Sequence, residues 1–182
     1  DKAAGRAIFK RYHADGAEPV VGISVRNWQH ETHFKDVMAE VSDRIVRELG
    51  ARVVFLPMQF PEDVHAAESI AERTHEPCTV LKDEYTTSEF LSLVGNMDLM
   101  LAIRLHALIF AGVMGVPMIG VSYDPKIDRF LASIGEKPVG SLDDVTADEL
   151  MAEIRRKWND KAVFRKRNAE LLAKLRDLAA RN

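Results

Sequence analysis

The sequence predicts an α/β fold, a Rossmann-like doubly wound parallel sheet with helices on both faces. Short apolar runs alternate with amphipathic segments along almost the whole chain, and only a few residues separate one from the next. Strands buried on both faces of a parallel sheet read as continuous apolar runs, and helices connect them. Because the chain shows neither an internal repeat nor a linker, we expect residues 1–182 to form one domain.

Five short apolar runs predict the strands. The first follows Pro19, the second ends at Pro57, and the fourth, DLMLAI, is apolar almost throughout, as is typical of a central parallel strand. Val139 is a candidate start for a short sixth strand. In chain order the five predicted strands cover residues 20–26, 52–56, 78–81, 98–103 and 118–123.

Helices are predicted between and after these strands, where apolar residues recur three and four positions apart. Gly50 and Gly135 end two of them, and Thr146 with Glu149 forms a capping box that opens another, running to Trp158. Residues 1–13 are also helix-like and lead into the first strand as if from a segment upstream. The helices predicted after the first strand cover residues 34–49, 61–74, 87–95, 105–114, 125–134, 147–158 and 161–180.

Composition excludes several classes of function. The chain has 182 residues and a net charge of −3, so it carries no basic footprint for nucleic acid. The single cysteine, Cys78, cannot form an internal disulfide, which fits a reducing compartment. No stretch approaches the roughly 18 uninterrupted apolar residues of a membrane span, and no signal peptide is visible. We therefore expect a cytoplasmic protein.

Candidate ligand-binding residues follow the strands. In an open parallel sheet, ligands bind beyond the carboxyl ends of the strands, where the first amides of the helices point. Arginine, lysine and histidine are prominent at these positions, in a chain whose net charge is negative. The residues concerned are Arg26, Gln59, Arg104, Leu105, His106, Tyr123 and Lys126.

Two of these turns place basic groups where a helix begins. Asp124 is a suitable N-cap and Pro125 a suitable first residue, which puts Lys126 in the first turn. There the helix dipole disfavours a lysine by up to about 1 kcal/mol. Arg104 and His106 flank a second helix start. Each alone has a structural explanation: a solvated lysine, a salt-bridged arginine, a core histidine. Together they predict a site for a multiply charged anion.

Other ligand motifs are weaker. His30 and His33 have an H-x-x-H spacing, but no third ligand accompanies them, and a solvated helix start explains them better. The chain has neither G-x-G-x-x-G nor G-x-x-x-x-G-K-[ST], which argues against dinucleotide and P-loop sites. These patterns therefore favour neither a metal site at the two histidines nor a dinucleotide or P-loop site.

The segment RLHALIFA at 104–111, followed by GVP at 115–117 and SYDPK at 122–126, resembles the polysaccharide pyruvyl transferase family. VGISVRNW at 21–28 and LPMQ at 56–59, with Asp63 close behind, fit the same family. The resemblance covers most of the chain. It implies a GT-B-like fold of two Rossmann-type lobes, of which this chain matches the C-terminal, donor-binding lobe. The N-terminal lobe is then absent from these 182 residues.

The resemblance also implies a reaction. The donor is phosphoenolpyruvate, used as a co-substrate without a metal or other cofactor, and the product is a pyruvate ketal on a cell-envelope saccharide or exopolysaccharide. His106 is the candidate general acid, since an imidazole titrates near working pH. By resemblance, Lys126 and Arg104 hold the phosphate and carboxylate, and Arg26 is a third cation. Leu105, Gln59 and Tyr123 complete the expected substrate site.

The expected partners follow from the same resemblance. They are the N-terminal lobe of the same enzyme and a saccharide acceptor, lipid-linked at the inner face of the cytoplasmic membrane, with peripheral membrane contact. Two alternatives stay open. One is the nucleotide-binding lobe of a GT-B nucleotide-sugar glycosyltransferase, although an acidic residue for the ribose and a paired-glutamate helix are not evident. The other is a non-catalytic anion-binding module.

Overall fold

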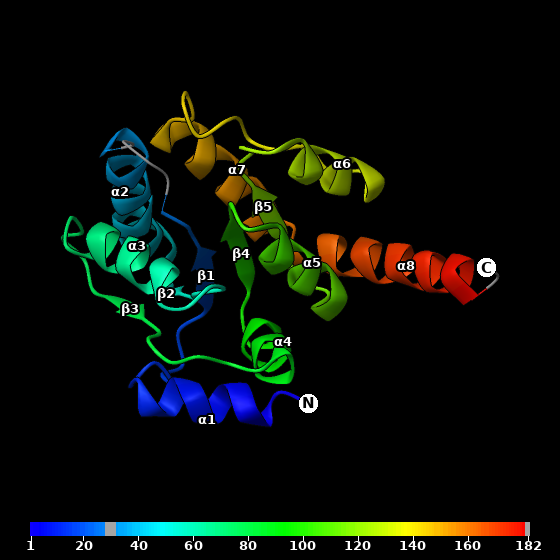
Figure 1. The fold of residues 1–182 in the computed structure, drawn as a ribbon, viewed down its shortest axis with the longest axis horizontal. Helices are drawn as coiled ribbons and strands as arrows, with labels where there is room; N and C mark the ends of the chain where they lie inside the picture. The colour runs from blue at the N-terminus through cyan, green and yellow to red at the C-terminus, as the bar shows by residue number, and fades with distance from the viewer. Residues whose placement is uncertain (28–31, 181–182) are drawn as a thin grey trace.

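The computed structural model describes residues 1–27 and 32–180, with side chains described as far as Ala173. Five strands form one sheet in the order β3-β2-β1-β4-β5, and every neighbouring pair is parallel. This order is that of a doubly wound fold, with β1 and β4 side by side at its centre (Figure 1). The strands are β1 (Val20–Ser24), β2 (Arg52–Phe55), β3 (Cys78–Val80), β4 (Leu99–Ala102) and β5 (Met118–Gly120).

Helices cover both faces of this sheet. In chain order they are α1 (Ala3–Arg11), α2 (Thr32–Leu49), α3 (Glu62–Ala71), α4 (Thr87–Gly95), α5 (Leu105–Met114), α6 (Pro125–Ser133), α7 (Ala147–Asn159) and α8 (Lys161–Ala180). One apolar layer joins the sheet to α2, α3 and α7, and the other joins it to α1, α4, α5 and α6. In Figure 1, α8 extends away from the sheet and carries the C-terminus. Its Leu171 packs against the second layer.

The alternation of side chains along each strand explains why both layers are apolar. Val21 and Ile23 of β1 belong to one layer, whereas Val20 belongs to the other. In β4, Leu99 and Leu101 face the first layer and Met100 the second. A strand that buries both faces must be apolar at every position, which is the pattern that predicted a parallel sheet.

The strands end together at one edge. Backbone hydrogen bonds continue past the strands, from Leu56 N–H to Ile23 O (2.8 Å) and from Ile103 N–H to Ser24 O (3.0 Å). On the far side of β4, Val121 N–H donates to Ala102 O (3.1 Å). The segments that follow β2, β1, β4 and β5 are therefore adjacent, and they carry all the candidate ligand-binding residues.

The predicted fold class is confirmed, with small changes at element ends. The strand predicted over 20–26 ends at Ser24, and the helix predicted over 61–74 covers Glu62–Ala71. Thr146 and Glu149 form the expected capping box. The helix at 87–95 has its own capping box, built from Thr86 and Glu89.

The prediction of a short sixth strand beginning at Val139 is wrong. The segment does run beside β5, since Val139 N–H donates to Gly120 O (2.9 Å) and Ser122 N–H to Gly140 O (2.9 Å). Only an isolated parallel bridge between Ser122 and Ser141 results. Pro138 before it has no amide to donate, and Asp144 accepts from Ser141 in the turn that follows, so the pairing stops.

Among the described helices, none combines the length and the apolar character that crossing a membrane requires.

Candidate functional site

The centre of the site is the start of α5, directly after β4. Arg104 is the N-cap residue, with extended backbone angles (φ −90°, ψ 120°), and it supplies no side-chain cap. Leu105 is the first helical residue and packs against the second apolar layer. His106 follows and is exposed to solvent. The buried strand thus fixes the backbone, and the helix start presents an imidazole and free amides at the sheet edge.

Arg104 is held by an ion pair with Asp63. Nε of Arg104 donates to Oδ2 of Asp63 at 3.0 Å, and Nη2 donates to Oδ1. Nη2 also donates to Oε1 of Gln59 at 3.3 Å. The pair is bidentate, and the Asp63 side chain has no exposed surface, whereas 16% of the Arg104 side chain is exposed. Arg104 therefore reaches from the end of β4 to the segment after β2.

Asp63 also shapes that segment. It lies in the first turn of α3, and its Oδ2 accepts the amides of Met58 (3.0 Å) and Gln59 (2.8 Å). These contacts fold the turn between β2 and α3 back onto the helix start. One carboxylate thus fixes both Gln59 and Arg104.

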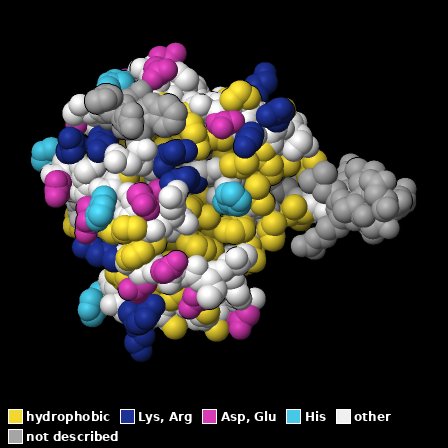
Figure 2. Space-filling view, viewed as in Figure 1, with side chains coloured by type: hydrophobic (Ala, Val, Ile, Leu, Met, Phe, Trp, Pro, Cys, Tyr) yellow, Lys and Arg dark blue, Asp and Glu magenta, His cyan; other side chains and the backbone are white. Residues whose placement is uncertain are grey.

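His106 lies in a hollow with an apolar wall. The wall comes from α4 and α5, where the rings of Phe90 and Phe110 stack with centroids 6.2 Å apart, and from Tyr85, whose ring meets Phe90 edge-on at 5.7 Å. Burial raises the pKa of Tyr85 well above its ordinary value, so its phenol stays neutral. Figure 2 shows the hydrophobic side chains gathered over α5. The hollow is lined by Met58, Gln59, Tyr85, Thr87, Phe90, Arg104, His106 and Phe110.

Arg26 and Tyr123 form a second group. Nη1 of Arg26 donates to the Tyr123 hydroxyl at 2.9 Å, and its guanidinium carbon lies 4.9 Å from the centroid of the Tyr123 ring. This contact joins the segment after β1 to the segment after β5. Because a phenol is neutral, this hydrogen bond orients the guanidinium without cancelling its charge.

Lys126 lies at the start of α6, as predicted. Asp124 is the N-cap, its Oδ1 accepts the Lys126 amide at 2.8 Å, and Pro125 is the first residue of the helix. The Lys126 residue is exposed, and within the described part of the chain its side chain makes neither a hydrogen bond nor an ion pair. It is a cation available to a ligand at the edge next to β5.

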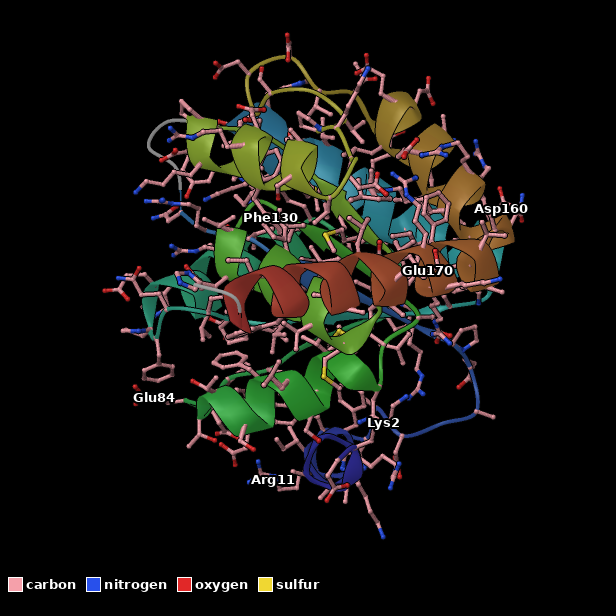
Figure 3. The ribbon with its side chains drawn as sticks, turned by 90° about the vertical axis from the view of Figure 1, so that its right-hand side faces the viewer. Lys2, Arg11, Glu84, Phe130, Asp160 and Glu170 are labelled. Atoms are coloured by element: carbon pink, nitrogen blue, oxygen red, sulfur yellow. The ribbon has the colours of Figure 1, made fainter. Side chains whose placement is uncertain are left out.

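The predicted site residues therefore lie in three groups at the sheet edge. Arg104, His106 and Gln59 share one hollow, Arg26 and Tyr123 are bonded to each other, and Lys126 stands at the next helix start. Leu105 anchors its helix in the apolar layer. Figure 3 shows α8 crossing over α5, with α6, marked by Phe130, on one side and α4 on the other.

Sequence reasoning missed the pairing of Asp63 with Arg104. In the sequence, Asp63 was noted only as a residue close behind LPMQ. Its position was a usable signal, because an aspartate in the first turn of a helix lies at the positive end of the helix dipole, here beside the ligand edge. The aromatic wall from Tyr85 and Phe90 was also missed, because these residues follow the edge strand β3 rather than a central one.

Of the H-x-x-H pair, His30 lies outside the described residues, as does Trp28. Across residues 1–27 and the described remainder, no three His, Cys, Asp or Glu side chains come together as ligands for a metal ion.

A comparison with models of protein families assigns the chain to one family. The model of the polysaccharide pyruvyl transferase family matches residues 9–125, which include all five strands and the starts of α3, α5 and α6. This chain belongs to the polysaccharide pyruvyl transferase family. A comparison with curated proteins found no match.

Solved structures show which fold this pyruvyl transferase family member shares. It resembles ADP-heptose lipopolysaccharide heptosyltransferase II of E. coli (TM-score 0.69, 12% identity, 89% of this chain and 53% of that one). It also resembles UDP-GlcNAc 2-epimerase of Neisseria meningitidis (TM-score 0.62, 12% identity, 90% and 42%). The chain thus spans about half the length, or less, of these two proteins.

A third likeness covers a whole domain. The C-terminal CMP-Kdo binding domain of WaaA from Acinetobacter baumannii matches with a TM-score of 0.62 at 10% identity, over 94% of this chain and 97% of that one. At such identities the likeness shows the fold alone: the parallel α/β sheet that glycosyltransferases and epimerases also use.

Proposed function

We propose that this pyruvyl transferase family member transfers the enolpyruvyl group of phosphoenolpyruvate to a saccharide and forms a pyruvate ketal, in the synthesis of a cell-envelope polysaccharide or an exopolysaccharide. The observation that carries the proposal is the position of His106, exposed at the start of α5 in the same hollow as the oriented guanidinium of Arg104. Family membership supports transfer to a polysaccharide.

The chemistry calls for one proton donor and several cationic groups. Protonation of the methylene carbon of phosphoenolpyruvate makes its C2 electron-deficient, and a first sugar hydroxyl adds there and loses its proton. Phosphate then leaves C2, and a second hydroxyl adds to the same carbon and loses its proton, which ends on the departed phosphate. The sum is phosphoenolpyruvate plus a diol, giving the ketal plus hydrogen phosphate, so no oxidant or reductant is needed.

Each role has a candidate at the sheet edge. His106 donates the proton, because imidazole is the side chain most suited to general acid catalysis near neutral pH. The donor's carboxylate and phosphate are held by Arg26, Arg104 and Lys126. The first backbone amides of α5 and α6 add further hydrogen-bond donors. Leu105, Gln59 and Tyr123 complete the substrate site.

The acceptor and the rest of the enzyme belong to the same proposal. A lipid-linked saccharide at the cytoplasmic face of the membrane serves as acceptor, with peripheral membrane contact. A second, N-terminal lobe completes the cleft above the edge where the strands end. The chain covers only 53% and 42% of the two longer proteins of similar fold, which supports a further lobe. We expect the 182 residues alone to bind the donor weakly and to transfer nothing.

A nucleotide-sugar-binding lobe is the second candidate. The observation that favours it is the structural match over 97% of the CMP-Kdo binding domain of WaaA. Such a lobe would bind a nucleotide at the same edge of the sheet.

Calorimetric titration of the 182-residue chain separates these functions. Phosphoenolpyruvate, uridine diphosphate and cytidine monophosphate are titrated separately at one ionic strength, because anion binding depends on salt. Heat from phosphoenolpyruvate alone supports the pyruvyl transferase. Heat from a nucleotide alone supports the nucleotide-sugar-binding lobe and contradicts the pyruvyl transferase. The absence of heat from all three ligands contradicts both proposals.

A further inference from the structure

The side chain of Asp63 is fully occupied by its neighbours. It has no exposed surface, and it accepts hydrogen bonds from the amides of Met58 and Gln59 and from two nitrogens of Arg104. An Asp–Arg pair of this geometry is bidentate and planar, so the guanidinium has one orientation.

This pairing divides the hydrogens of Arg104 into two sets. Nε and Nη2 serve Asp63, and Nη2 also serves Gln59. Nη1 makes no hydrogen bond with any of the described residues, and its two hydrogens lie on the edge of the guanidinium away from the carboxylate. Arg104 thus retains a pair of directed donors at the hollow that contains His106.

The same pairing removes the net charge of Arg104. An isolated guanidinium attracts any small anion, whereas a guanidinium neutralised by a buried carboxylate favours an anion only where an oxygen meets its remaining hydrogens. In the proposed reaction this difference matters, because inorganic phosphate is a product and must leave the site. A site built from net charge alone would retain it.

We propose that Asp63 is a positioning residue that determines specificity: by fixing and neutralising Arg104, it makes the site select phosphoenolpyruvate over inorganic phosphate. The inference rests on the proposed function, since it concerns the same donor. In the competing explanation, Asp63 only stabilises the turn after β2, and its replacement changes stability without changing the choice between the two anions.

The first test is Asp63→Asn, measured by calorimetry with phosphoenolpyruvate and with inorganic phosphate at one ionic strength. Asparagine keeps the shape but leaves the charge of Arg104 uncompensated and its orientation looser. We expect phosphate to bind as well as before or more tightly, and phosphoenolpyruvate to bind more weakly. Their ratio of affinities should fall about tenfold or more, the factor for one charge-assisted hydrogen bond.

Glu62→Gln is the matched control. Glu62 precedes Asp63 in the same first turn, is exposed, and loses the same charge on substitution. We expect its ratio of affinities to stay within about twofold of the parent. An equal fall in both variants would mean that the charge of the helix start, rather than the pairing, sets the ratio, and would overturn the proposal.

The double variant Asp63→Asn/Arg104→Gln removes the pair without changing the net charge, and it keeps the test decisive if Asp63→Asn does not fold. We expect its phosphate affinity to stay within about twofold of the parent. Its affinity for phosphoenolpyruvate should fall about tenfold or more. Equal losses for both anions would make Arg104 a simple counter-charge, and no loss for either would make the pair structural. Both results overturn the proposal.

Phosphoenolpyruvate binding to the parent chain distinguishes a failure of the proposed function from a failure of the role given to Asp63. If it binds no phosphoenolpyruvate, the proposed function fails and this inference fails with it. If it binds phosphoenolpyruvate and the variants keep the parental ratio, only the role of Asp63 is wrong.

Discussion

Arg26 donates a hydrogen bond of 2.9 Å to the hydroxyl of Tyr123 and so connects two strand ends that are not neighbours in the sheet. β4 lies between β1 and β5, and the guanidinium spans its end. The hydrogen bond and the ring face, 4.9 Å away, fix the arginine from two sides. Tyr123 is in turn held by packing against both apolar layers.

Tyr123→Phe tests whether this contact serves donor binding. Phenylalanine keeps the ring against the guanidinium and removes only the hydroxyl, so Arg26 loses one of its fixed points. We expect phosphoenolpyruvate affinity to fall about two- to tenfold, the range for one hydrogen bond, with little change in melting temperature. Tyr12→Phe is the control, because Tyr12, at the C-terminal end of α1, likewise loses a hydroxyl, one that accepts a hydrogen bond from the Lys82 amide. Equal affinities for parent and Tyr123→Phe would show that Arg26 needs no such support.

Lys126→Met tests the cation at the start of α6. A lysine in the first turn opposes the helix dipole, so its removal should leave thermal stability unchanged or slightly higher, by about 0.3–1 kcal/mol. Phosphoenolpyruvate should bind more weakly, and its binding should depend less on salt, because one charge is gone.

Lys137→Met is the matched control for Lys126, since it removes an exposed lysine that does not open a helix. Melting curves and calorimetry at two salt concentrations give both readings. A lower melting temperature with parental donor affinity would show that Lys126 is structural.

His106→Gln tests the general acid. Glutamine keeps much of the size and some hydrogen bonding but cannot supply the proton, so turnover of the complete enzyme should fall about 10²–10⁴-fold. Donor affinity should fall much less. Phosphate release with a saccharide acceptor is measured between about pH 5 and 8, where an imidazole titrates.

His65→Gln controls for the loss of an exposed histidine, because His65 lies on α3 outside the hollow. It should keep parental turnover and the parental pH profile. Near-parental turnover in His106→Gln would mean that another group supplies the proton.

The sequence was sufficient for the fold because each signal was local. An apolar run such as 99–102 lies between two helical patterns, and its neighbours along the chain settle whether it is a strand. The strand ends then placed Arg26, Arg104 and Lys126 at one edge, since parallel strands of a doubly wound sheet end together.

The pairings at that edge were not predictable in the same way. Asp63 and Arg104 are 41 residues apart, and Arg26 and Tyr123 are 97 apart. Which carboxylate or phenol meets which guanidinium depends on strand order and on side-chain packing, neither of which appears in a local pattern. The sequence therefore predicted cations for an anion site and allowed for a salt-bridged Arg104, but it did not identify Asp63 as the partner.

Asp43 gives a prediction for pH dependence away from the site. It lies on α2 with its side chain 5% exposed, and it accepts the amides of His75 (2.9 and 3.1 Å) and Glu76 (2.8 Å). Its Oδ2 also lies 3.1 Å from Nδ1 of His75. Burial alone would raise the pKa of Asp43, but the hydrogen bonds from Glu76 and His75 outweigh it and lower the pKa.

Asp43→Asn should therefore cost stability in a way that depends on pH. A carboxyl whose pKa is lower in the folded state stabilises fully above its unfolded pKa, near 4, and loses that contribution as the pH falls through the folded value. At pH 7 we expect the variant's free energy of unfolding to be about 1–3 kcal/mol lower than the parent's, the cost of weakened bonds to a buried carboxylate. The difference should shrink as the pH falls below about 4. Urea unfolding across this range measures it, with Asp36→Asn, an exposed partner of Arg73, as a control that should change little. A deficit that stays the same at every pH would mean that the amides at residues 75 and 76 depend on the shape of Asp43 and not on its charge.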